Sequence, residues 1–150
     1  MQIDLQTENV AKLIQLALGP VFLISGVGIT LNMLTSRLSR VVDRARTLEA
    51  QRESTSNEKR LGAIDYDLKV IFRRARYING AIVLATMSAF LTALVVTLLF
   101  ASEFTPLGVG PLIALMFVSS MVSLSVAFLL FLLEVRIAIN ALRIGTHRND

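Results

Sequence analysis

The chain has 150 residues, of which 54% are hydrophobic and 17% are charged, and its formal net charge is +4. A soluble domain of this length has too little interior to bury so much apolar surface, so the composition favours a membrane protein. The absence of cysteine excludes disulfides, thiolate nucleophiles and cysteine-ligated metal sites.

Three segments are long and apolar enough to cross a bilayer. They run from about 13 to 34, from 78 to 100 and from 112 to 133, and none contains a charged residue. About 20 consecutive apolar residues cross a hydrocarbon core of about 30 Å. Buried helices of a soluble bundle are the alternative, but such helices normally have a polar face. We therefore expect three transmembrane helices.

The basic residues predict the orientation of these spans. Eleven of the 15 Lys and Arg residues lie in residues 36–77, three lie in 134–150, one lies in 1–12, and none lies in 101–111. Loops rich in Lys and Arg remain in the cytoplasm. The sequence thus predicts a cytoplasmic 36–77 segment and C-terminus, with the N-terminus and the 101–111 loop outside.

The 36–77 segment has the pattern of two amphipathic helices. Apolar residues recur at helical spacing in both halves: Leu38, Val41, Val42, Ala45 and Leu48, then Leu61, Ile64, Leu68, Ile71, Ala75 and Ile78. The polar residues 51–59 between them predict a turn, with Ser56 or Asn57 as the N-cap of the second helix. The expected fold is all-α, with a cytoplasmic antiparallel helical hairpin extending from the first two spans. Because two such helices cannot bury both apolar stripes in each other, we expect neighbouring copies to cover the remainder.

Residues 37–46, RLSRVVDRAR, form the most basic stretch of this segment. A solvated face with ion pairs inside the helix is one interpretation, and a contact with another subunit or with anionic lipid headgroups is a second. Nucleic-acid binding is disfavoured, because an acid lies among the arginines and topology alone accounts for their position. The candidate assembly residues are Arg37, Arg40, Asp43 and Arg44.

The first span contains a proline and several small or polar residues. Gly19-Pro20 predicts a kink near residues 16–20, because proline removes a backbone donor and clashes with the preceding turn. The small and polar candidates are Ser25, Gly26, Thr30 and Asn32. They suit either close packing between helices or the lining of a pore.

The other two spans carry further stripes of small and polar residues. In the second span, Ala81, Ala85, Ala89, Ala93 and Thr97 recur every four residues and predict a close-packing face. In the third span, Ser119, Ser120 and Ser123 precede Glu134 on one arc. One interpretation is helix packing, with Glu134 paired to Arg37 or Arg76. The alternative is a polar pore or a proton or cation pathway.

These features together resemble a known family. The first span LALGPVFLISGVG of residues 16–28, then Asn32 and the stretch RLSRVVDRAR, and the basic RRAR of residues 73–76 resemble small bacterial membrane proteins catalogued as a domain of unknown function. The resemblance covers nearly the whole chain. It implies three spans in a bacterial inner membrane, and it implies no activity.

The residues present no catalytic constellation and imply no cofactor or metal, so we expect a protein that is not an enzyme. The favoured function is a homo-oligomeric structural or interaction assembly in the bilayer. An ion channel or transport pore on the oligomer axis is one alternative. An accessory subunit of a larger membrane complex is the other.

Overall fold

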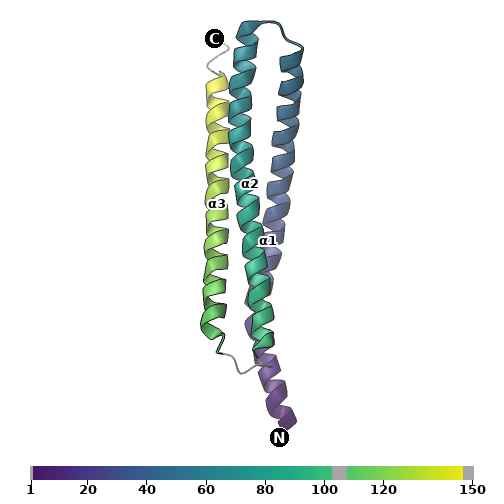
Figure 1. Ribbon diagram of the computed structural model, residues 1–150, viewed down its shortest axis with the longest axis vertical. Coiled ribbons are helices and arrows are strands. Elements are labelled where there is room, and N and C mark those ends of the chain that lie inside the picture. Colours follow the sequence, from purple (N-terminus) through teal and green to yellow (C-terminus); the bar gives the residue numbers. More distant parts are fainter. Residues whose placement is uncertain (1, 103–107, 147–150) are drawn as a thin grey trace. The chain divides into compact units, whose positions relative to one another are not determined.

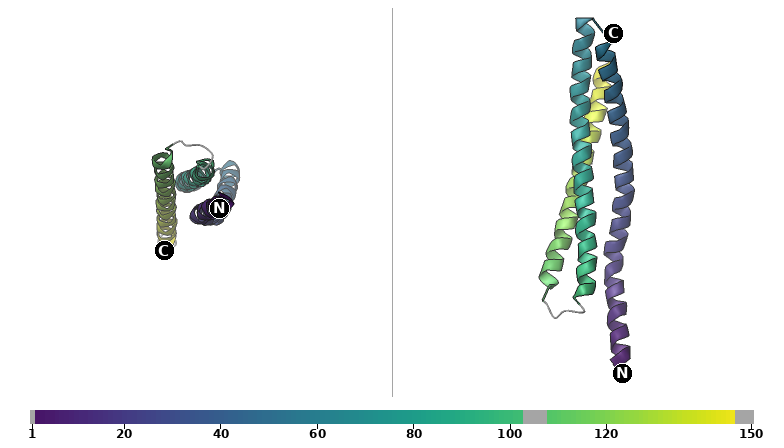
Figure 2. Two further views of the ribbon diagram at one scale, coloured as in Figure 1. Left: turned by 90° about the horizontal axis from the view of Figure 1, so that it is seen from below. Right: turned by 45° about the vertical axis from the view of Figure 1, so that its right-hand side comes forward.

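The described part of the chain is entirely helical. The computed structural model describes residues 2–102 and 108–146, with side chains described for 10–102 and 108–139. These residues form α1 (Gln2–Glu53), α2 (Glu58–Ala101) and α3 (Gly110–Thr146), without a strand (Figures 1 and 2). The three helices confirm the predicted all-α class. The predicted outer loop lies partly outside the described residues, at 103–107.

Each helix contains a segment long and apolar enough to cross a membrane, so the chain has three candidate membrane spans. α1 and α2 each continue without interruption from an apolar span into the charged 36–77 segment. α1 also continues through Pro20. The sequence prediction of three spans, two of them extended, agrees with these helices.

The turn between α1 and α2 lies inside the predicted polar segment. α1 ends at Glu53 and α2 begins at Glu58. The backbone N–H of Lys59 donates to the Asn57 side-chain oxygen at 3.1 Å, which satisfies one of the unpaired donors at the start of a helix. Asn57, rather than Ser56, is therefore the N-cap of α2.

Buried positions recur every seven residues along all three helices. The repeats are Pro20, Val27, Leu34, Val41 and Leu48 on α1; Ile71, Ile78, Ala85 and Thr92 on α2; and Ser120, Ala127 and Glu134 on α3. A seven-residue repeat of contacts, or 3.5 residues per turn, is typical of knobs-into-holes packing. The helices therefore pack in the manner of coiled-coil bundles.

The helices divide into two compact units. Unit 1 comprises Met1–Leu31 and Leu84–Ser125, and unit 2 comprises Asn32–Val83 and Val126–Asp150. Unit 2 contains the charged segment and the cluster of buried apolar side chains. Those side chains are Leu34, Val41, Ala45, Leu48, Leu68, Ile71, Ile78 and Ala81.

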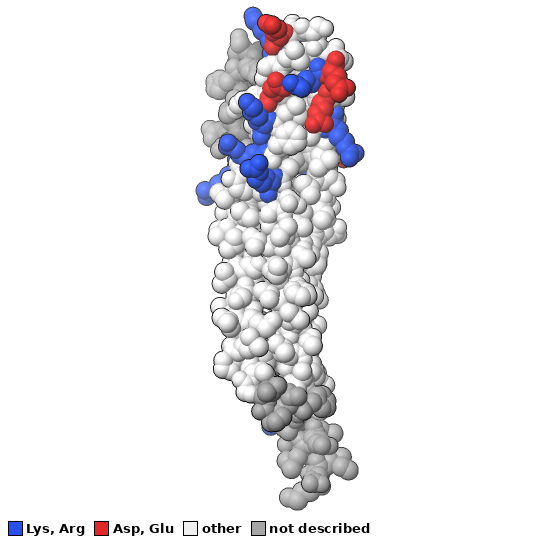
Figure 3. Space-filling view, viewed as in Figure 1, with Lys and Arg blue, Asp and Glu red and all other residues white. Residues whose placement is uncertain are grey.

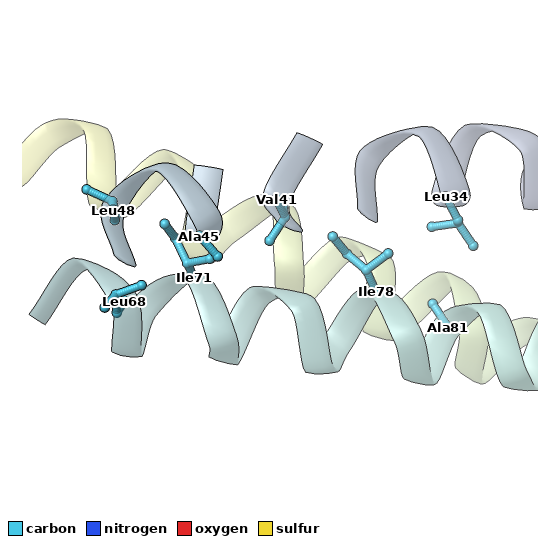
Figure 4. Packing of buried hydrophobic residues seen from close by; sticks show 8 residues of the cluster. All are labelled: Leu34, Val41, Ala45, Leu48, Leu68, Ile71, Ile78 and Ala81. Atoms are coloured by element: carbon cyan, nitrogen blue, oxygen red, sulfur yellow. The ribbon is translucent and has the colours of Figure 1, made fainter. Parts of the chain in front are cut away.

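Within unit 2, α1 and α2 run in opposite directions. Figure 4 shows Leu48 beside Leu68 at one end of the cluster and Leu34 beside Ala81 at the other. The predicted apolar stripes thus form this core, with two exceptions: Leu61 is half-buried and lies outside the cluster, and Val42 lies at the surface. Val42 is 37% exposed, because it lies about 100° around the helix from Val41, which is buried in the core.

The predicted small-residue face of α2 is only partly buried. Ala81 and Ala85 are buried, whereas Ala93 and Thr97 are exposed. Four residues turn a helix by about 400°, so a ladder with a spacing of four drifts about 40° per step around the axis. The buried face instead alternates steps of three and four: Ile78, Ala81, Ala85, Ser88, Thr92 and Val95.

Gly80 marks a close approach between α2 and α3. A Cβ at Gly80 would lie 3.1 Å from the Leu130 Cδ1, whereas a Cβ at Gly62 would meet no atom within 4 Å. Gly80→Leu should lower the stability of the protein by about 1–3 kcal/mol through overpacking. Gly62→Leu should not lower it, because leucine favours a helix over glycine by roughly 0.8 kcal/mol. Thermal unfolding in detergent micelles measures both, and equal losses would contradict the assigned contact.

Candidate functional site

Glu134 is a charged residue in a core position of unit 2. It occupies the seven-residue repeat of α3 in line with Ala127, and its exposed fraction is 0%. Removing a carboxylate from water is unfavourable by several kcal/mol unless cations and hydrogen bonds compensate. A buried acid at this position therefore requires partners from the neighbouring helices.

Two arginines supply this compensation. Arg37 of α1 donates from Nη1 to Glu134 Oε2 at 2.7 Å. Arg74 of α2 donates from Nε and Nη2 to Glu134 Oε1 at 3.0 and 2.8 Å. Both carboxylate oxygens are thus occupied, and the two ion pairs connect all three helices within unit 2. We call Glu134, Arg37 and Arg74 the Glu134 cluster.

The Arg37 guanidinium is held on a second side by an aromatic ring. Its central carbon lies 4.9 Å from the centroid of the Phe131 ring, within the range of a cation–π interaction. Phe131 precedes Glu134 by three residues, so both lie on one face of α3. Arg37 is thereby oriented by two side chains of the same helix.

The pairing partly matches the sequence prediction. The sequence predicts Arg37 or Arg76 as the partner of Glu134. The structure pairs Glu134 with Arg37 and also with Arg74, which is not among the predicted partners. Arg74 follows the buried Ile71 by three residues and precedes the buried Ile78 by four, which places it on the core face of α2. Arg76 lies two residues after Arg74, which is about 200° around the helix, and it is therefore exposed. The spacing of Arg74 from Ile71 and Ile78 can be read from the sequence, and it identifies Arg74 as the arginine on the core face.

A surface depression adjoins the Glu134 cluster. It has a volume of about 320 Å³ and is lined by Arg37, Arg40, Val41, Arg74, Val135, Ala138 and Ile139. We call it the arginine depression. A second depression in unit 2, of about 570 Å³, has a mixed lining of Glu49, Arg52, Glu53, Asp65, Leu68, Lys69 and Phe72. Figure 3 shows blue and red side chains gathered over part of unit 2.

The second depression contains an exposed ion pair. Arg52 Nε donates to Asp65 Oδ1 at 2.7 Å, and both side chains are about half exposed. Water screens such a pair, so it contributes at most about 1 kcal/mol to stability. This exposed ion pair is therefore a control for the stability that the two ion pairs of the buried Glu134 contribute.

The other predicted assembly residues lie at the surface of unit 2. Arg40, Asp43 and Arg44 are exposed, in contrast to the half-buried Arg37. Among the described residues, the salt bridges do not include Asp43. The structure therefore separates Arg37, which pairs with Glu134 inside the chain, from three neighbours that are exposed.

The polar candidates of the first span make bonds within their own helix. The Ser25 hydroxyl donates to the Val21 carbonyl oxygen, and the Thr30 hydroxyl donates to that of Gly26. Ser25, Gly26 and Asn32 are exposed, and the backbone oxygen of Asn32 accepts from Ser36. A Cβ at Gly19 or Gly26 would meet no atom within 4 Å. This face of α1 is thus uncovered in the single chain.

The serines of the third span separate into different roles within unit 1. Ser120 is fully buried and contacts the Ser88 hydroxyl oxygen at 3.0 Å and the Thr92 hydroxyl oxygen at 2.6 Å. Ser123 donates to the Leu84 carbonyl oxygen at 2.9 Å. Ser119 is exposed and donates to Leu115 of its own helix. The hydroxyls of Ser120 and Ser123 therefore bond α3 to α2.

The described side chains present no metal site. Among residues 10–102 and 108–139, no group of three or more His, Asp or Glu residues is placed to hold a metal ion.

Replacing Glu134 by glutamine tests the energetic role of the cluster. Glu134→Gln should lower the free energy of unfolding by about 3 kcal/mol, because it leaves two partly buried guanidiniums without their carboxylate. Asp65→Asn, which breaks the exposed pair, should lower it by less than about 1 kcal/mol. Unfolding in mixed detergent micelles measures both values. Equal small losses would show that Glu134 is not a principal stabilising residue.

Replacing Ser120 tests the buried hydroxyl contacts. Ser120→Ala should destabilise the protein by roughly 1 kcal/mol, because it removes hydrogen bonds that join α2 to α3. Ser125→Ala should have little effect, since the exposed Ser125 hydroxyl donates only to Met121 of its own helix. Thermal unfolding of both variants in the same detergent provides the comparison. A larger loss at Ser125 would contradict the assignment.

Comparison with known proteins identifies a family. The profile of the family DUF2721, described as a protein of unknown function, matches residues 17–144. No curated protein and no solved structure matches the chain. The matched residues include most of the first span, the arginine-rich stretch and all members of the Glu134 cluster. The chain therefore belongs to the DUF2721 family.

Proposed function

We propose that this protein is a non-catalytic, homo-oligomeric assembly of the bacterial inner membrane, with residues 36–77 and the C-terminus in the cytoplasm. The orientation is supported by the location of 11 of 15 Lys and Arg residues in one segment between spans. In this orientation, the extended ends of α1 and α2 form a cytoplasmic antiparallel hairpin. Its role is structural, or it presents a surface to other proteins.

The observation that carries the assembly proposal is the exposure of large apolar side chains outside the apolar spans. Tyr66 and Phe72 are 55% and 54% exposed, and Val42 is 37% exposed. All three lie in the charged segment of residues 36–77, outside the predicted spans. Side chains of this kind, surrounded by charged residues, are typical of an interface.

Two further features support association between copies. Arg40, Asp43 and Arg44 are exposed and place positive and negative charges on one helix. The same surface on two copies can therefore form ion pairs with itself. In the first span, the space around Gly19 and Gly26 would admit a close helix neighbour. A two-fold or cyclic arrangement would cover both regions.

Oligomeric mass measurements test the proposal directly. Native mass spectrometry of the protein released from nanodiscs should give one defined species of more than one chain. Phe72→Glu should shift that species toward the monomer, because it places a charge in the proposed interface. Asp43→Arg should do the same by creating like charges beside Arg40 and Arg44, while insertion into the membrane stays unchanged. Asp67→Arg serves as the control, since it makes the same charge change at another exposed acid.

Other outcomes would overturn the proposal. A wild-type protein that is monomeric at every concentration would exclude self-assembly. Unchanged mass in both Phe72→Glu and Asp43→Arg would exclude the proposed surface. Ion flux into liposomes that depends on Asn32 would instead indicate the pore alternative.

A further inference from the structure

We propose that the arginine depression binds the phosphate group of an anionic phospholipid. Every residue that lines this site belongs to one chain, so binding does not require a second copy, although Arg40 also belongs to the proposed contact between copies. Its three arginines come from two helices: Arg37 and Arg40 lie on α1, and Arg74 lies on α2. The α3 residues Val135, Ala138 and Ile139 form an apolar wall.

Among the described residues, the lining of the depression carries more positive than negative charge. Its lining contains three arginines and no acid. Glu134 neutralises one of these charges, so a formal surplus of two positive charges remains. A concentration of positive charge of this kind attracts an anion of one or two negative charges, such as a phosphate ester.

The guanidinium groups also retain hydrogen-bond donors. Each guanidinium has five N–H donors, and Glu134 accepts one from Arg37 and two from Arg74. The Arg37 and Arg74 side chains are 33% and 27% exposed, so their remaining donors have access to the surface. Glu134 and Phe131 hold Arg37 in a fixed orientation, which reduces the entropy lost when a ligand binds. The arginines are therefore pre-oriented for phosphate.

The position of the depression favours a lipid as the source of the phosphate. Arg74 lies four residues before Ile78, where the second span begins, which corresponds to about 6 Å along the helix. Arg40 and Ile139 each lie six residues beyond the end of a span, or about 9 Å. The headgroup region extends about 5–8 Å beyond the hydrocarbon core. The Arg74 backbone thus lies within the headgroup region, and the Arg40 backbone lies about 1 Å beyond it, a gap that a long arginine side chain spans. The arginines are therefore within reach of the lipid phosphates, and Val135, two residues beyond the third span, is the lining residue nearest to the acyl chains.

A pair of arginine variants distinguishes a defined site from general surface charge. Arg40→Gln removes a lining residue that takes no part in the ion pairs of Glu134, so the core remains intact. Arg44→Gln removes the same charge from an exposed position on the same helix, outside the depression. Basic residues near a membrane each contribute about 1 kcal/mol to the attraction of anionic lipid, which corresponds to roughly fivefold in affinity.

The experiment measures retention of phosphatidylglycerol by native mass spectrometry, with phosphatidylcholine as the zwitterionic reference. The wild type should retain phosphatidylglycerol selectively. Arg40→Gln should reduce its apparent affinity about fivefold, and Arg44→Gln should leave it nearly unchanged. Equal losses in both variants would show diffuse surface charge and overturn the proposal.

A competition arm identifies the source of the phosphate. Inorganic phosphate should not displace phosphatidylglycerol at matched concentration, because it makes no contact with the apolar wall. Displacement by inorganic phosphate would assign the depression to a soluble anion and overturn the lipid proposal. Equal retention of phosphatidylcholine and phosphatidylglycerol would show that the site does not require an anionic lipid, and would overturn the proposal. Because Arg40 and Arg44 also belong to the proposed contact between copies, the oligomeric mass of each variant is recorded in the same spectra, so that a loss of lipid and a loss of self-assembly are distinguished.

Discussion

The carboxylate of Glu134 is the constraint on which the packing of unit 2 depends. A charge at a core position of α3 is tolerated only while cations are present on the facing helices, since an uncompensated buried charge is unfavourable by several kcal/mol. Arg37 and Arg74 meet this requirement from α1 and α2. The apolar cluster of unit 2 is not directional, whereas these ion pairs have defined geometry. The Glu134 cluster therefore selects one arrangement of the three helices from the many that would bury a similar apolar area.

Unit 1 also has buried polar groups, but these are neutral hydroxyls. Ser88, Thr92 and Ser120 occupy core positions and satisfy each other by hydrogen bonds across α2 and α3. On α2, Arg74 and Ser88 are separated by fourteen residues, and on α3 their partners Glu134 and Ser120 are separated by the same number. Each unit thus pairs α2 with α3 in the same antiparallel register. A shift of one heptad would separate buried polar groups from their partners, which supports a role for them in specifying register.

The arginine-rich stretch has more than one role. Arg37 belongs to the internal ion pairs, while Arg40 lines a depression and Arg44 faces outward. Their different environments follow from the helical repeat, which turns successive residues by about 100°. A buried ion pair and an outward basic surface are therefore compatible within ten residues, and the same arginines serve as the proposed orientation signal.

The sequence by itself determined the helical class, the three apolar spans and the extended amphipathic ends of α1 and α2, because these depend on local hydrophobicity and spacing. It also offered Arg37 or Arg76 as a partner of Glu134, beside the alternative of a polar pathway, without deciding between them. It did not reveal the seven-residue repeat within the spans, since nearly every residue there is apolar and the buried face has no polar contrast. It did not separate Ser120 from Ser119, or indicate that Arg40 lines a depression. Only the tertiary structure decided these points, because they depend on which side of each helix faces a neighbour.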